Sequence, residues 1–198
     1  MAMRLQELHP SLVHYPLTFF PLALVADTLG KVTGSRTLLR IGKWGIGAAA
    51  VSAAAAGVAG LIAQESVNVE GPTEDLLVTH RNLNLGFISV ATAMAVQRSF
   101  RRAPTARYLG LGFAALGGAL FSAYLGGHMV YEHGVGVRAA RGVREEDAPI
   151  LRPTRAREIT RHAIGQAEMG LRRMVDETRH GRIMPALAHV DAPEDRVH

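Results

Sequence analysis

The sequence of 198 residues contains no cysteine. This absence excludes disulfide bonds, iron–sulfur clusters held by thiolates, covalent attachment of a c-type haem, and thiol nucleophiles. The sequence also lacks a nucleophile elbow, a phosphate-binding glycine loop and a pair of catalytic carboxylates at recognisable spacing. The residues therefore indicate none of the common enzyme classes.

Charged residues are almost absent from four long apolar stretches, which cover residues 12–29, 44–63, 83–96 and 108–131. Roughly 20 helical residues, at about 1.5 Å each, cross the ~30 Å hydrocarbon core of a bilayer. The third stretch reaches that length only if its first turn includes His80, Asn82 and Asn84. We therefore predict an all-α fold, a bundle of four transmembrane helices. A soluble all-α bundle with unusually apolar helices is the alternative.

The second stretch is rich in alanine and glycine, with Gly57 and Gly60 near its end. Small residues gain little by facing lipid, but they allow helix backbones to approach closely. This helix is therefore expected at the centre of the bundle.

The cations flank the apolar stretches unevenly and give the chain a net charge of +5. The links after the first and third stretches are basic, and the loop after the second is acidic. Their charged residues are Lys31, Arg36, Arg40 and Lys43, then Arg98, Arg101, Arg102 and Arg107, and the acidic Glu65, Glu70, Glu74 and Asp75. Cytoplasmic loops carry the excess of lysine and arginine, so we predict both basic links in the cytoplasm and both termini in the periplasm of a bacterial inner membrane. Arg138, Arg141 and Arg144 oppose this orientation, but they begin a long tail, and long segments translocate largely regardless of charge. Basic charge beside apolar stretches indicates a lipid bilayer and not nucleic acid as the partner.

The chain changes character after the fourth stretch, so we divide it into a membrane domain, 1–137, and a polar tail, 138–198. A helix is predicted after Thr154, with an apolar stripe bordered by arginines. The stripe consists of Ile159, Ala163, Ala167, Leu171, Met174 and Val175. Such an amphipathic helix could lie on lipid, on a partner protein or on its own bundle.

Five of the nine histidines lie at helix ends that this topology brings to one side of the membrane. They are His9, His14, His80, His128 and His133. None lies on the basic links. Ionisable residues within membrane segments generally mark functional sites, so we predict a histidine-lined site near the periplasmic face.

Two kinds of cofactor suit this set. A b-type haem could be held by two imidazoles from different helices, with His14 and His128 as the first choice and His80 in reserve. Arg81 and Asn82 would then bind a propionate, although they could equally satisfy loop carbonyls. Copper or zinc could instead use three of the five imidazoles, with Glu132 as an added ligand or as a residue that orients one.

Two motifs resemble those of a bacterial family of four-helix membrane proteins of unknown function. They are His9-Pro10-x-x-Val13-His14-x-Pro16 and Gly126-Gly127-His128-x-Val130-Tyr131. The resemblance covers residues 6–137, and His80 matches the family's histidine at the opening of the third helix. Some relatives are joined to, or encoded beside, Rieske-type or other redox proteins, so the resemblance implies a redox role.

These observations together predict a haem-binding electron-transfer subunit with a redox or membrane-complex protein as its partner. A structural or assembly subunit without redox activity, and a membrane protein that binds copper or zinc, are the alternatives.

Overall fold

The computed structural model describes residues 4–137, 140–143 and 150–188. These residues form helices and no β-strand beyond two isolated bridges, Arg4–Ile150 and Val67–Val143. The long helices are α2 (His14–Thr33), α3 (Arg36–Ala63), α4 (Pro72–Ser99), α5 (Ala106–Tyr131) and α6 (Ala156–Arg179). The short ones are η1 (Leu5–Glu7), α1 (Leu8–Leu12), η2 (Gln64–Ser66), η4 (Pro153–Arg155) and α7 (Pro185–Ala188). The predicted all-α fold is confirmed.

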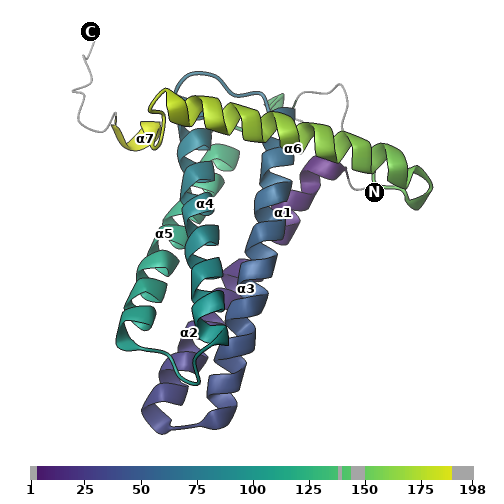
Figure 1. The fold of residues 1–198 in the computed structure, drawn as a ribbon. Helices are drawn as coiled ribbons and strands as arrows, with labels where there is room; N and C mark the ends of the chain where they lie inside the picture. Colours follow the sequence, from purple (N-terminus) through teal and green to yellow (C-terminus); the bar gives the residue numbers. More distant parts are fainter. Residues whose placement is uncertain (1–3, 138–139, 144–149, 189–198) are drawn as a thin grey trace.

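Local capping explains two of the reversals of the chain. Helix α2 ends at Gly34, whose φ of 70° is the left-handed conformation that glycine adopts without strain. Ser35 then caps α3 by accepting a hydrogen bond from the Leu38 amide. Thr105 caps α5 in the same way, through the Tyr108 amide. Both connections, α2–α3 and α4–α5, lie at the end of the bundle away from α6 (Figure 1).

Helix α3 is central, as its small residues predict, because it packs against α1, α2, α4 and α6. Ala49 and Ala53 lie in the core beside the aromatic pair Phe20 and Phe87, whose ring centroids are 4.8 Å apart. A side chain at Gly45 would press against Ala23 of α2. Small residues thus bring the backbones of α2 and α3 close together.

Among the residues that the structure describes, three segments are long and apolar enough to cross a membrane by length and composition: Leu5–Thr33, Arg36–Ser66 and Ala106–Tyr131. The predicted count of four is not confirmed. Helix α4 has a comparable 28 residues, more than the 14 of the apolar stretch read from the sequence. Its polar side chains lower its hydropathy, and several of them, including Thr79, Arg81 and Arg98, are buried inside the protein.

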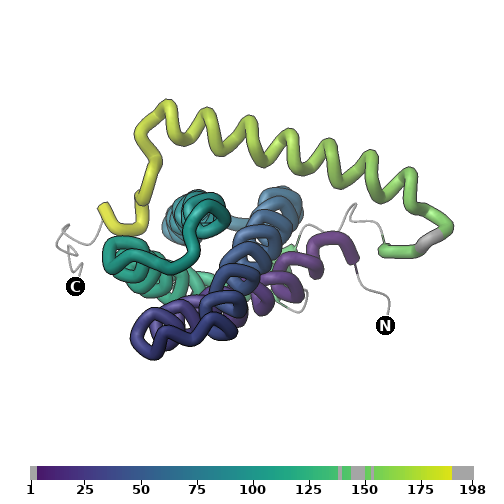
Figure 2. The backbone as a smooth tube through the Cα atoms, turned by 60° about the horizontal axis from the view of Figure 1, so that its bottom comes forward, coloured from purple at the N-terminus to yellow at the C-terminus, as the bar shows by residue number. Residues whose placement is uncertain are grey.

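Helix α6 begins two residues after Thr154 and lies across the other end of the bundle, where it packs on α3 and η2 (Figure 1). Figure 2 shows it running along one side of the helix ends. The sequence left lipid, a partner protein and the chain's own bundle as possible surfaces for the tail helix. The structure shows that this helix packs on its own bundle. Arg138 and Arg144, which oppose the predicted orientation, lie outside the described residues.

Candidate functional site

Two histidines from different helices face each other at the end of the bundle that α6 covers. His9 of α1 and His80 of α4 have ring centroids 6.3 Å apart, with their planes nearly perpendicular at 88°. Both side chains are largely shielded from solvent. Neither belonged to the pair first chosen from the sequence.

The His9 ring is anchored on α3. Its Nδ1 lies 2.9 Å from the carbonyl oxygen of Ala56. One turn along α3, a Cβ at Gly60 would come within 3.1 Å of the ring. Gly60 therefore makes room for the imidazole against the α3 backbone.

The His80 ring is anchored on α5 in a similar way. Its Nδ1 lies 2.8 Å from the carbonyl oxygen of Ser122, and a Cβ at Gly126 would come within 3.0 Å of its Cε1. The Asn84 amide nitrogen lies 3.1 Å from His80 Nε2 and 2.8 Å from Ser122 Oγ. The ring is thus held between two helices.

These contacts fix the tautomer of both rings. A carbonyl oxygen can only accept a hydrogen bond, so Nδ1 carries the proton in His9 and in His80. A neutral ring of this kind keeps its lone pair on Nε2. Among the described residues, His9 Nε2 has no hydrogen-bond partner, and His80 Nε2 has only the Asn84 amide. Nδ1–H bound to a backbone carbonyl is the usual arrangement for a histidine that binds a metal through Nε2.

The other three candidate histidines lie apart from this pair. His14 is exposed on α2, and His128 stacks on Tyr124 at 6.0 Å and meets the exposed His133 at 5.3 Å. Among the described residues, no ring contact joins His14 to His128, the predicted haem pair. Positions five apart on a helix differ by about 140° around its axis, so equal spacing in the two motifs does not turn both members inward.

No group of three or more histidine, aspartate and glutamate side chains that could hold a metal occurs among the described residues. The predicted site of three imidazoles with Glu132 is therefore not formed by the residues that the structure describes. Among the described residues, His9 and His80 are the histidine pair that joins two helices, whereas His128 and His133 meet each other at the end of α5.

Comparison with known protein families matches residues 6–139 to the family described as "Predicted membrane protein (DUF2231)". The chain belongs to this family. The resemblance inferred from the two motifs is thereby confirmed at the level of a membrane protein family of unknown function. No curated protein and no solved structure matches the chain at a significant level.

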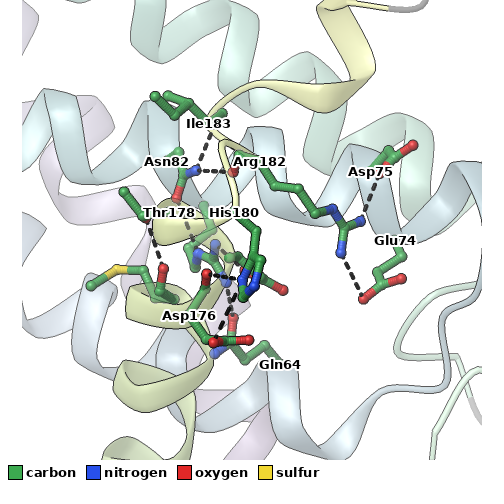
Figure 3. Close-up of polar contacts among 12 residues, drawn as sticks. Gln64, Glu74, Asp75, Asn82, Asp176, Thr178, His180, Arg182 and Ile183 are labelled. Carbon is green, nitrogen blue, oxygen red and sulfur yellow. Dashed lines mark hydrogen bonds and ion pairs between the residues drawn. The ribbon is translucent and has the colours of Figure 1, made fainter.

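The family region contains all five candidate histidines, whereas α6 and α7 lie beyond it. Arg81 nevertheless forms a buried ion pair with Glu177 of α6 at 2.5 Å, and it donates a longer hydrogen bond to Gln64. Asn82 donates to the carbonyl oxygen of Ile183 at 2.6 Å (Figure 3). The two residues predicted to bind a propionate thus hold the tail onto the DUF2231 bundle.

Further charged contacts strengthen this attachment. Arg182 binds Asp75 at 2.7 Å and Glu74 at 3.5 Å, near the start of α4 (Figure 3). The hydrogen bond to Asp75 is the main cause of a raised pKa for Arg182. Arg173 of α6 binds Glu65 at 3.1 Å. The acidic residues on which the predicted orientation partly rests are therefore also the docking surface of the tail.

Proposed function

We propose that this protein binds one transition-metal ion, copper or zinc, between the Nε2 atoms of His9 and His80. The observation that carries the proposal is the anchoring of each Nδ1–H on a backbone carbonyl of a neighbouring helix. That anchoring presets both imidazoles in the tautomer that binds metal and holds them before any metal arrives.

The separation of the rings supports the same reading. Two imidazoles that share an ion, with metal–nitrogen bonds of about 2.0–2.1 Å, hold their ring centroids roughly 5–6 Å apart. The observed 6.3 Å is close to this value. The Asn84 amide, now beside His80 Nε2, has to withdraw when a metal binds. Imidazole ligands without thiolate suit copper and zinc.

A b-type haem that transfers electrons is the second candidate. Its support is that two imidazoles from different helices, each with Nδ1–H on a carbonyl, have the character of axial ligands. A haem also needs a flat space beside the rings. The contacts of His9 with Gly60 and of His80 with Gly126 fill part of that space, so a single ion fits this conformation better.

In this proposal α4 is a fourth crossing of the bacterial inner membrane, with its polar residues turned to the bundle interior. The basic α2–α3 and α4–α5 links lie in the cytoplasm, and the histidine pair lies near the periplasmic face. Lys31 and Lys43 support this placement, since both bind backbone carbonyls at the end away from α6. A partner protein of the membrane complex would supply or receive the metal or its electrons.

The experiment uses full-length protein purified in detergent from cells supplied with iron, copper and zinc. Absorbance spectra detect haem, and elemental analysis gives the metal content. His80→Asn is the most informative variant, because an Asn nitrogen can replace Nδ1–H as donor to the Ser122 carbonyl while Nε2 is lost. His9→Asn tests the other ring, and His14→Ala and His128→Ala are the matched controls.

About one copper or zinc ion per chain, lost in both Asn variants and kept in both Ala variants, is the expected result. A Soret band that disappears in the Asn variants would show that His9 and His80 bind haem and not a single metal ion. A Soret band that instead depends on His14 and His128 would overturn the assignment of the pair. Protein without metal and without colour would contradict the proposal. His9 and His80 would then serve only to hold helices together in a structural or assembly subunit.

A further inference from the structure

Helix α6 has an apolar strip whose side chains remain exposed on the surface of the protein. Ile164, Leu171 and Val175 are 62%, 48% and 39% exposed. At about 100° per residue they lie within roughly 40° of one another around the helix. The opposite side of α6 contributes the contacts to the bundle, through residues such as Gly170, Arg173 and Glu177.

The contacts with α3 indicate which way the strip faces. Arg173 reaches Glu65, which lies just beyond the last residue of α3. On the helical wheel the strip lies about 160–180° from Arg173. On the same wheel Gly170 lies between Arg173 and the strip. It packs against the carbonyl of Leu61, which precedes Glu65 by four residues and belongs to the apolar length of α3. Going around α6 from Arg173 through Gly170 therefore follows α3 from Glu65 toward its apolar length, and the strip comes next on the wheel, outside the contacts with the bundle.

The position of α6 along the bundle also suits contact between the strip and lipid. The helix lies across the ends of segments that are long and apolar enough to span a membrane, and it runs along the side of these ends (Figures 1 and 2). Asp176, with 72% of its side chain exposed, lies about 60° from Arg173 and about 120° from the centre of the strip. The exposed surface of α6 thus carries the apolar strip, the charged pair Glu168 and Arg172 at its edge, and Asp176 farther round with exposed Met169 beside it. Helices that lie in the plane of a membrane surface have such an apolar strip bordered by charged residues.

We propose that the strip formed by Ile164, Leu171 and Val175 rests on phospholipid, at the boundary between headgroups and acyl chains of the bilayer that the bundle spans. Arg157, which lies beside the strip on the wheel, extends its guanidinium to the lipid phosphates. The tail helix is then held on two sides. Its polar residues bind the helix ends, and its apolar residues bind lipid.

The absence of cysteine makes a direct test possible, because one introduced cysteine is the only labelling site. Full-length Leu171→Cys and Asp176→Cys proteins carry a fluorophore whose emission depends on polarity. Each is placed in vesicles of phosphatidylcholine and phosphatidylglycerol, with or without lipids that carry a quencher on the acyl chain. Val175→Cys repeats the test within the strip, and gel filtration confirms that each labelled protein is folded.

We expect the probes at 171 and 175 to emit at shorter wavelength than the probe at 176, and only these two to lose intensity with quencher lipids. Emission at 171 and 175 equal to that at 176, without quenching, would place the strip in water and overturn the proposal. Blue-shifted emission without quenching would also overturn it, since the strip would then be covered by a protein or by a second copy of the chain.

Discussion

Arg98 of α4 holds Asp27 of α2 in an ion pair buried completely within the bundle. Its Nε and Nη2 nitrogens lie 2.8–3.1 Å from the carboxylate oxygens of Asp27. The two side chains are 1% and 0% exposed. The guanidinium also donates to the backbone carbonyls of Leu39 and Arg101. This pair fixes α2 against α4 at the end opposite His9 and His80, and a single chain thus has a polar centre at each end of its apolar core.

Removal of one partner of this pair is expected to be strongly destabilising. Asp27→Ala leaves a buried guanidinium without its counter-ion, which should lower the free energy of unfolding by about 3–5 kcal/mol. Arg172→Ala is the control, because its pair with Glu168 is exposed and such pairs contribute about 1 kcal/mol or less. Chemical unfolding in detergent micelles measures both. A double replacement, Asp27→Leu with Arg98→Leu, should recover much of the loss, and equal stability of Asp27→Ala and the wild type would contradict this account.

Gly42 is expected to be essential to the same pair. A Cβ at this position would overlap the carboxylate of Asp27. Gly42→Ala should therefore lower the melting temperature. Gly47→Ala is the matched control on the same helix, since nothing lies within 4 Å of its added Cβ and alanine favours a helix by about 1 kcal/mol over glycine. Thermal unfolding followed by circular dichroism compares the two, and a loss at Gly47 as large as that at Gly42 would show that the carboxylate is not the cause.

Gly126 and Gly127 give a second matched comparison, at the histidine pair. A Cβ at 126 would press on the His80 ring at 3.0 Å, whereas a Cβ at 127 meets nothing within 4 Å. Gly126→Ala should displace the ring and weaken metal binding, and Gly127→Ala should leave it unchanged. Competition with a metal-sensitive dye measures the affinity. Equal affinities in both variants would argue that His80 does not hold the metal.

The attachment of the tail should depend on Glu177. Glu177→Ala leaves Arg81 buried and unpaired, and we expect α6 and α7 to dissociate from the bundle with a local loss of about 3–5 kcal/mol. Hydrogen exchange should then become faster in residues 156–188, but not in α2 or α3. Glu168→Ala, which breaks an exposed pair on the same helix, is the control. Unchanged exchange in Glu177→Ala would mean that other contacts suffice to hold the tail.

Sequence patterns predicted the helical fold because they depend on chain-local properties. Each of the four long uncharged stretches falls on one of the long bundle helices, α2 to α5, and the alanine and glycine of residues 44–63 indicated the packed centre. Helix α4 was predicted too short, since His80, Arg81 and Arg98 interrupt its apolar pattern. These residues are tolerated there because the fold supplies Ser122, Glu177 and Asp27 as partners.

The choice of histidines could not be made in the same way. His14 and His128 were favoured by depth along the helices, but a contact also requires that two rings point toward each other. The rotation of each helix decides this, and it is set by the packing of α2, which carries His14, on α3 and α5, and of α5, which carries His128, on α4 and α2.

The sequence by itself determined that the chain forms apolar helices, that five of its nine histidines lie at the ends of these helices, and that a polar amphipathic helix follows. Local composition and periodicity are enough for these features. Only the tertiary structure decided that His9 meets His80, that Asp27 meets Arg98 and that Arg81 holds the tail. Each of these contacts joins residues that are distant in sequence, and it depends on how every helix is turned when small and large side chains pack together.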